Sequence, residues 1–175
     1  MKALIVDDER LARKELMKLL EEHPSIEIVG EAMNAEEAIQ MVNELNPDLL
    51  FLDIQMPGKT GFQLLEELDA VPFVVFTTAY DEFALKAFEV NALDYLLKPI
   101  QADRLSETVS KILDKEKSKS AAVRNADKKL GLNDQVFVKD GDRCWFVSLN
   151  NVRMFESDGN YIKVYFDNNR PMIHK

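Results

Sequence analysis

Short runs of apolar residues recur along the first part of the chain, and each one predicts a β-strand. The segments 4–6, 49–52 and 73–76 are apolar throughout, which is typical of strands buried on both faces of a parallel sheet. Two further candidate strands occupy 27–30 and 93–97. The apolar pattern therefore predicts a sheet whose central strands are covered on both sides.

Between these runs, apolar residues return at three- and four-residue spacing, the period of an amphipathic helix. The clearest stripe covers 35–42, and it follows Asn34, a typical N-cap residue with Glu37 three positions later. Strands that alternate with helices predict the α/β class, with a doubly wound parallel sheet and helices on both faces. We expect the flavodoxin-like (βα)5 arrangement, with strand order 2-1-3-4-5. The other helical stripes lie at 16–20, 62–68, 83–88 and 105–113.

The pattern changes after Leu113. Residues 114–133 are rich in Lys, Ser, Ala and Asp without a sustained apolar stripe, so we interpret them as a helix end and a linker. Farther along, apolar and polar residues alternate, and both Asp140-Gly141 and 157–160 resemble hairpin turns. We predict a first domain at 1–115, a linker at 116–134, and an incomplete all-β domain at 135–175.

Composition narrows the class of protein. Apolar residues make up 46% and charged residues 30% of the 175 residues, an ordinary globular mixture. No apolar run approaches the roughly 18 residues of a membrane span, and Lys2 and Asp7 interrupt any signal-peptide core. The single cysteine, Cys144, excludes an internal disulfide framework. We therefore expect a cytoplasmic protein that makes no membrane contact.

The net charge of −9 is divided unequally along the chain. Residues 1–113 carry 22 acidic and 10 basic side chains, a balance of −12, whereas 114–175 carry 9 and 12, a balance of +3. An acidic first part is a poor nucleic-acid binder, while a basic second part is compatible with one. We expect the two parts to have different partners.

Carboxylates follow two of the predicted strands. Asp7 and Asp8 come directly after the first strand, and Asp53 ends the third. In the order 2-1-3-4-5 these strands are neighbours at the point where ligands bind, so the three side chains meet in one crevice. Their mutual repulsion requires a cation, and hard oxygen ligands of this kind suit Mg²⁺. Glu9, the next residue, is expected to start a helix, where an acidic side chain suits the dipole.

Polar residues also end the fourth and fifth predicted strands, at Thr77-Thr78 and at Lys98. A hydroxyl, an ammonium group and a divalent cation around one carboxylate form a site for a transferred phosphoryl group, because they neutralise its oxygens. Asp53 is then the nucleophile, and it becomes an aspartyl phosphate.

Four motifs at these strand ends resemble one family. Alone, each fits a simpler interpretation, such as a solvated turn, a loop or a core residue. Together and in this order, they resemble the CheY-like receiver domain of a response regulator, in which an aspartate takes a phosphoryl group from the phosphohistidine of a histidine kinase. The resemblance covers residues 1–115. The motifs are VDDE (6–9), LDIQMPG (52–58), TTA (77–79) and DYLLKP (94–99).

The resemblance implies a metal-binding role for four residues. Asp8 and Asp53 contact Mg²⁺ directly, and Asp7 acts mainly through water. The backbone carbonyl of Gln55 is the remaining protein ligand.

The resemblance also implies the residues of a switch. Thr78 is the switch hydroxyl, with Thr77 as the less favoured neighbour, and Tyr95 is the switch aromatic. Lys98 acts together with Asp53 in phosphoryl transfer. The Lys98-Pro99 bond is expected to be cis, a state accessible mainly before proline.

Two other site chemistries are excluded by spacing. The sequence PGKTG (57–61) contains Gly-Lys-Thr, but a P-loop needs glycine at position 53, which is Asp53. His23 and His174 are far apart in the sequence and lack the spacing of zinc ligands.

The segment VRMFESDGNYIKVYF (152–166) resembles the beginning of a LytTR DNA-binding domain, and with the receiver it resembles a LytR/AlgR-type response regulator. By position, Asn160 is a candidate base contact, since amides read adenine edges. Lys163 and Arg153 are candidate phosphate contacts. In a simpler alternative, Asn160 is a turn residue that tolerates positive φ. The family's domain continues past 175, so we expect a truncated LytTR domain here.

The expected function is that of a two-component response regulator. A cognate sensor histidine kinase phosphorylates Asp53 with Mg²⁺, and a homodimer then forms through the fourth helix, fifth strand and fifth helix. The complete LytTR domain binds DNA and regulates transcription. Because phosphoryl transfer takes place only at Asp53 of the chain itself, we expect a phosphoacceptor rather than an enzyme. One alternative is a receiver-only interaction module whose truncated effector no longer binds DNA. Another is a Mg²⁺-dependent phosphohydrolase, which usually needs an acid at the position of Gln55.

Overall fold

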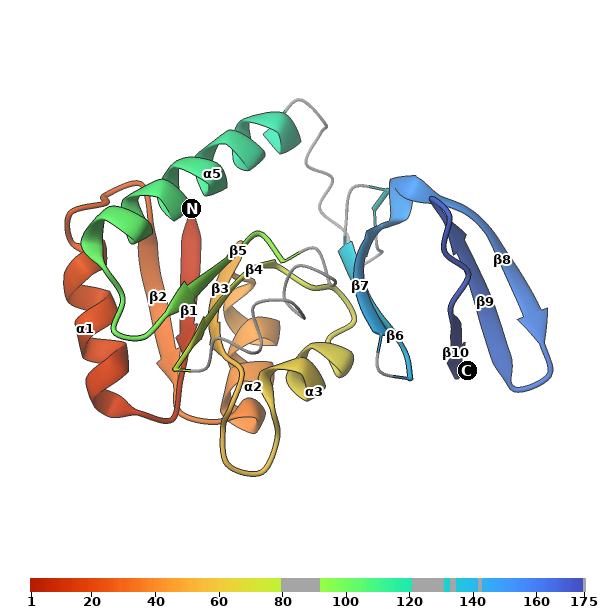
Figure 1. Cartoon of the computed structure of the whole chain (residues 1–175), viewed down its shortest axis with the longest axis horizontal. Helices are drawn as coiled ribbons and strands as arrows, with labels where there is room; N and C mark the ends of the chain where they lie inside the picture. The colour runs from red at the N-terminus through yellow and green to blue at the C-terminus, as the bar shows by residue number, and fades with distance from the viewer. Residues whose placement is uncertain (80–91, 121–130, 133–134, 142, 175) are drawn as a thin grey trace.

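The computed structural model describes the chain apart from residues 80–91, 121–130, 133–134, 142 and 175. Its first part is a five-stranded parallel sheet in the order β2-β1-β3-β4-β5 (Figure 1). This order confirms the flavodoxin-like prediction. The strands are β1 (Lys2–Val6), β2 (Glu27–Ala32), β3 (Leu49–Asp53), β4 (Phe73–Thr78) and β5 (Asp94–Leu97).

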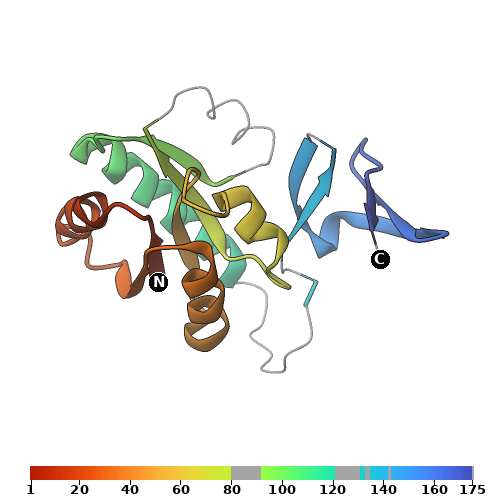
Figure 2. The same cartoon turned by 90° about the horizontal axis from the view of Figure 1, so that it is seen from below.

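Helices cover both faces of this sheet (Figures 1 and 2). On one face lie α1 (Arg10–Leu20) and α5 (Ala102–Ser120), and on the other lie α2 (Ala35–Leu45) and α3 (Gly61–Glu66). Because successive side chains of a strand point to opposite faces, two separate cores form, and every residue of β3 and β4 is buried. The helix predicted at 83–88 lies outside the described residues.

Side-chain caps fix the starts of the two helices on the second face. The Asn34 side chain accepts a hydrogen bond from Glu37 N at 2.9 Å, which confirms the predicted N-cap of α2. The Glu37 carboxylate accepts from Met33 N at 2.8 Å. At α3, Thr60 and Gln63 form a reciprocal capping box. These caps define where the loops after β2 and β3 end.

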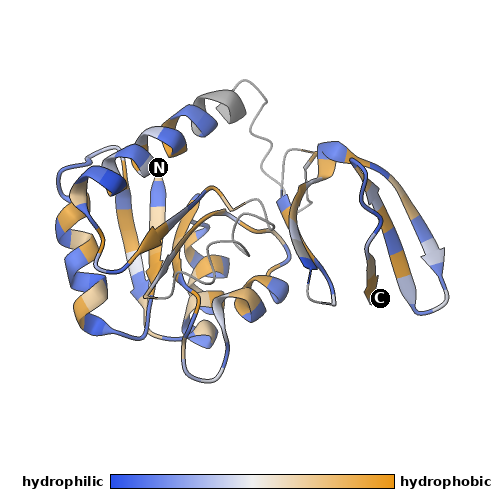
Figure 3. Cartoon of the chain, viewed as in Figure 1, coloured by the Kyte–Doolittle hydropathy of each residue, from blue (hydrophilic) through white to orange (hydrophobic). Residues whose placement is uncertain are grey.

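Two small antiparallel sheets follow the receiver-like part. The β6–β7 pair turns at Gly141, with φ at +61°, where the sequence predicts a hairpin. The second sheet has the order β10-β9-β8, and Figure 3 shows apolar residues spaced along its strands. Val138, Val147, Val164 and Phe166 form the core that the two sheets share. The elements are β6 (Gln135–Asp140), β7 (Arg143–Ser148), the 3-10 helix η1 (Leu149–Asn151), β8 (Val152–Asp158), β9 (Tyr161–Phe166) and β10 (Met172–His174).

The β6–β7 hairpin packs beside α3 (Figure 2). Phe146 on β7 is 7% exposed and joins the core beneath α2 and α3. Val71 N donates to Gln135 O at 3.0 Å, in an isolated bridge between the two parts. Lys139 Nζ lies 2.7 Å from Glu66 Oε1. An apolar contact, a backbone bond and an ion pair therefore join the hairpin to the first domain.

The last helix of the first domain is longer than its apolar stripe. α5 continues to Ser120, so the predicted linker at 116–134 begins inside this helix. Within the described part of the chain, no helix is long and apolar enough to cross a bilayer.

Candidate functional site

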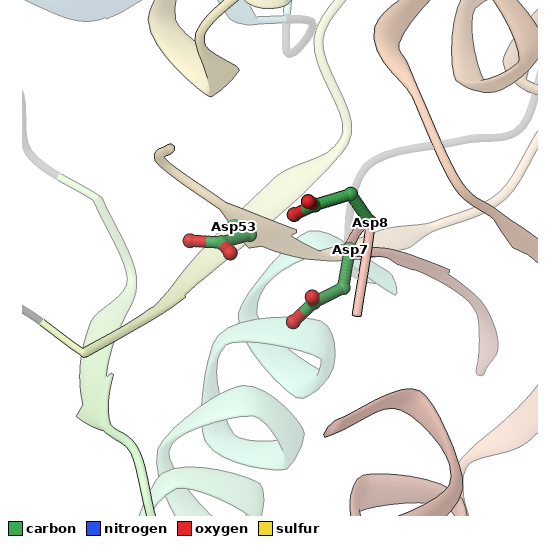
Figure 4. Close-up of side chains that lie close together, drawn as sticks. All are labelled: Asp7, Asp8 and Asp53. Atoms are coloured by element: carbon green, nitrogen blue, oxygen red, sulfur yellow. The ribbon is translucent and has the colours of Figure 1, made fainter. Parts of the chain in front are cut away.

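Three carboxylates meet at the carboxyl edge of the parallel sheet (Figure 4). Asp7 and Asp8 follow β1, and Asp53 ends the neighbouring strand β3. Each contributes one oxygen, and these oxygens lie within 4.8 Å of one another. Asp7 and Asp53 are buried, whereas Asp8 is exposed. The strand order therefore brings together the three side chains that the sequence placed at the metal site.

Lys98, which follows β5, places its ammonium group among these acids. Lys98 Nζ lies 2.7 Å from Asp7 Oδ2 and 2.9 Å from Asp53 Oδ2. On the exposed side, Glu9 Oε1 is 3.4 Å from the same nitrogen. The lysine therefore neutralises part of the negative charge at the strand ends. The Lys98-Pro99 peptide bond is cis, as the family resemblance implies.

Burial and pairing act in opposite directions on these groups. Burial raises the pKa of Asp7 and of Asp53, although Lys98 partly offsets the effect. Burial would lower the pKa of Lys98, but its hydrogen bonds to both carboxylates outweigh burial and raise that pKa. The ammonium group therefore stays charged. A further cation in the site would stabilise the ionised form of each buried acid.

The backbone around Asp53 is closely packed. Gln55 N donates to Asp53 Oδ1 at 3.2 Å, and Gly61 N donates to Ile54 O at 2.9 Å. A Cβ atom at Gly61 would lie 2.4 Å from Asp53 O, so this approach of α3 to β3 requires glycine. Neither periodicity nor motif spacing in the sequence signals the contact.

The predicted switch residues lie on neighbouring strands beside the acids. Thr77 and Thr78 end β4, and both are buried. The register pairs Thr77 with Asp53, so Thr78 lies one residue farther toward the carboxyl edge. Tyr95 on β5 is 9% exposed and belongs to the core on the α2 and α3 side. Its side chain is therefore already inside the domain.

The comparisons with known proteins agree with this geometry. The family model of the response regulator receiver domain matches residues 3–110. The chain belongs to this family. An uncharacterized response regulatory protein of Vibrio cholerae serotype O1 is 54% identical over 117 residues, which cover 66% of this chain and 49% of that protein. The transcriptional regulatory protein BtsR of Escherichia coli strain K12 is 54% identical over 120 residues, 67% of this chain and 50% of BtsR. The chain spans about half the length of these relatives.

Solved receiver domains share the fold of the first part. The response regulatory domain of mrkE from Klebsiella pneumoniae has 36% identity and a TM-score of 0.62, covering 67% of this chain and 99% of that domain. The REC domain of AraT, a response regulator from Geobacillus stearothermophilus, has 34% identity and a TM-score of 0.61, covering 68% and 97%. Both matches support the flavodoxin-like prediction.

A second charged cluster fixes the receiver's last strand to α5, and the sequence analysis missed it. The Asp94 carboxylate accepts hydrogen bonds from Thr108 Oγ1 at 2.8 Å, Lys111 Nζ at 2.9 Å and Arg104 Nη2 at 2.5 Å. Burial would raise the pKa of Asp94, but these bonds outweigh it and lower the pKa to about 2. The three partners recur at helical spacing on one face of α5, a polar stripe that the sequence does contain. Because Asp94 precedes Tyr95, the cluster anchors the strand that carries the predicted switch aromatic.

The residues predicted to contact DNA lie on the β8–β9 hairpin. Asn160 is exposed in the turn, but the positive φ of 57° belongs to the preceding glycine. The simpler interpretation of Asn160 as a turn residue is therefore confirmed, but Asn160 itself does not adopt a positive φ. Lys163 Nζ pairs with Asp158 Oδ2 at 2.7 Å, and Arg153 donates to the carbonyl of Asp167. Both predicted phosphate contacts thus already have partners within the chain.

Proposed function

We propose that the chain is the phosphoacceptor of a two-component phosphorelay, in which Asp53 receives a phosphoryl group from a cognate sensor histidine kinase. The observation that carries the proposal is the buried Asp53 carboxylate, 2.9 Å from Lys98 Nζ and beside two further acids. An oxygen of Asp53 forms the bond to phosphorus as the phosphorus–nitrogen bond breaks, and the electron pair leaves with the imidazole. The chain carries this one group as a signal, so its role is that of a signalling protein rather than an enzyme.

Mg²⁺ is the cation that we propose for the carboxylates. Asp8, Asp53 and the backbone carbonyl of Gln55 would hold it, with Asp7 acting through water. The donor set fits, because three hard carboxylate oxygens lie within 4.8 Å of one another and the single charge of Lys98 neutralises only part of their negative charge. The bound ion would supply charge neutralisation at the phosphoryl oxygens.

The side chains around Asp53 would complete the site. Lys98 would bind a phosphoryl oxygen from the β5 side, and the Thr78 hydroxyl would bind another from β4. The movement of Thr78 would favour the buried position of Tyr95 and shift a pre-existing equilibrium of the face that includes β5 and α5. We propose that a homodimer forms through this face together with the predicted helix at 83–88.

Phosphorylation by a small donor tests the proposal. With acetyl phosphate and Mg²⁺, intact-mass spectrometry should detect one added phosphoryl group, and peptide mapping should place it on Asp53. The D53N variant should lose it, whereas D69N, an exposed carboxylate on the same domain, should keep it. Label that persists on an aspartate of D53N would contradict the proposal, and rapid multiple turnover of a phosphate ester would favour the phosphohydrolase.

Metal binding has its own measurement. Millimolar Mg²⁺ should raise the melting temperature, because an ion that binds only the folded state stabilises it. A melting temperature that Mg²⁺ leaves unchanged would contradict the metal site. The D8N variant should lose most of the shift, with D69N again as the control.

We further propose that the C-terminal strands begin a LytTR-type domain and that the whole protein is a cytoplasmic LytR/AlgR-type transcription regulator. The support is the motif on β8 and β9, together with the name of the relative BtsR, a transcriptional regulatory protein. Fluorescence anisotropy with the DNA upstream of its own gene should show binding that weakens steeply with salt. N160A and K163Q should weaken it, and K18Q, an exposed lysine on α1, should not.

A receiver that serves only as an interaction module is the second candidate. The intrachain partners of Lys163 and Arg153 favour it, because both cations are already engaged. In that case anisotropy stays flat even at low salt.

A further inference from the structure

Arg13 reaches from α1 into the loop that carries two of the acids. Its side chain is only 11% exposed although it belongs to a helix on the surface of the domain. Arg13 Nη1 donates to Asp7 O at 2.7 Å and, less closely, to Asp8 O at 3.4 Å. The guanidinium therefore binds the main chain of the segment whose side chains form the carboxylate cluster.

The other side of the same guanidinium is anchored on β2. Arg13 Nε lies 2.7 Å from Glu31 Oε2, and Glu31 pairs with Ile5 of β1 in the sheet register. The planar fork of arginine can serve a carboxylate and a carbonyl at once, which the single ammonium of lysine cannot do. Arg13 thus ties three elements, α1, β2 and the loop after β1, at one point.

Fixing these carbonyls also restricts the carboxylates on the same residues. Asp7 is further held by Glu9 N, which donates to Asp7 Oδ1 at 2.9 Å. Asp8 is exposed, and its carbonyl accepts a hydrogen bond from Arg13. Loss of Arg13 would therefore release Asp8 more than Asp7.

We propose that Arg13 is a positioning residue for the divalent cation, acting through the main chain of Asp7 and Asp8, with Glu31 as its anchor. The inference rests on the proposed function, because it assigns Arg13 to the same metal site. Groups that orient metal ligands typically change metal affinity by roughly 10–100-fold when they are lost. Arg13 is a cation itself, so a purely electrostatic role would have the opposite sign: its removal would strengthen the binding of Mg²⁺.

The test compares R13Q with K14Q, which removes the same charge from an exposed position on the same helix. Mn²⁺ binding, measured by electron paramagnetic resonance, and Mg²⁺ binding, measured by calorimetry, give affinities without any phosphoryl transfer. R13Q should weaken both by about tenfold, and K14Q should leave both near wild type. With acetyl phosphate, R13Q should need more Mg²⁺ for half-maximal phosphorylation, while its rate at saturating Mg²⁺ stays close to wild type.

Two further variants separate positioning from charge and from folding. R13K keeps the charge but not the planar fork, so it should still bind the cations weakly. Wild-type cation affinity in R13K would overturn the proposal. E31Q leaves Arg13 in place and removes its anchor; it should weaken metal binding in the same direction by a smaller factor, even if R13Q does not fold. If the wild-type chain binds no cation, the proposed function is refuted. If the wild type binds the cation and R13Q binds it as tightly as K14Q does, the role of Arg13 is refuted.

Discussion

The receiver domain and the C-terminal strands build their cores in different ways. In the receiver, β3 and β4 are buried at every residue, because helices cover both faces of the sheet. In the C-terminal part, β8 is exposed along most of its length, and Phe155 on this strand is 58% exposed. The C-terminal part also contributes Phe146 to the core of the receiver. The receiver therefore has a core of its own, whereas the hairpin β6–β7 shares one.

This difference indicates where the hairpin obtains its stability. A two-stranded hairpin is marginal in water, and three or more strands or a helix to pack on are needed. The β6–β7 hairpin has both kinds of support, from the β8–β10 sheet and from α3. We therefore expect the hairpin and the receiver to unfold as one unit.

The largest expected effect comes from the aromatic residue at the contact. Phe146→Ala should lower the free energy of unfolding by about 3 kcal/mol, because it removes a buried ring and leaves a cavity. Phe155→Ala, on the exposed strand, should change it by less than about 0.5 kcal/mol. Urea unfolding is followed by the fluorescence of Trp145, the single tryptophan, and by helical circular dichroism.

The two signals also test whether the parts unfold together. In the wild type they should change in one transition. In Phe146→Ala the fluorescence of Trp145 should change at lower urea than the helical signal, since Trp145 lies on β7, the strand that Phe146 joins to the receiver core. Equal costs for the two variants, or separate transitions in the wild type, would contradict the shared core.

The same contrast explains what the sequence could predict. The five strands and their order follow from apolar runs and helical stripes, because burial on both faces leaves a clear local pattern. The meeting of Asp7, Asp8 and Asp53 follows from that order, since neighbouring parallel strands end at one edge. Local pattern and topology together thus predict the carboxylate cluster.

Contacts between distant surface positions could not be predicted in this way. Arg13 and Glu31 look like solvated residues in the sequence, and only the packing of α1 against β2 brings them together. The approach of Gly61 to Asp53 depends on the path of a loop, and the burial of Phe146 depends on a contact across the linker. Each arises from tertiary packing that no periodicity encodes.

The next effect concerns charge, and it contrasts a partly buried acid of the receiver, Asp94, with an exposed acid on β8. Asp94 has a pKa of about 2, below the usual 3.8, so the folded state favours its ionised form. Its contribution of about 2 kcal/mol is complete above pH 3.8 and is lost as the pH falls toward 2. D94N should therefore be less stable than the wild type at neutral pH and should lose less stability on acidification.

Asp158 provides the matched control for this prediction. It also pairs with a lysine, Lys163, and the pairing lowers its pKa, but it lies on an exposed strand. Thermal unfolding measured from neutral pH to pH 2 should give D158N nearly the same melting temperature as the wild type at each pH. If D94N loses as much stability on acidification as the wild type does, the Asp94 cluster does not stabilise the receiver.

The smallest effect is the ion pair at the edge of the shared core. Lys139 and Glu66 lie 2.7 Å apart, but their side chains are 41% and 33% exposed, so solvent screens the pair. A double-mutant cycle with K139E, E66K and the swapped double variant should give a coupling free energy of about 0.5 kcal/mol that decreases with salt. A coupling of zero at low salt would mean that the hairpin does not dock here in solution.

Repeating the cycle on the phosphorylated chain then separates two cases. An unchanged coupling means that the hairpin stays docked when Asp53 carries the phosphoryl group. A lost coupling means that the hairpin is released.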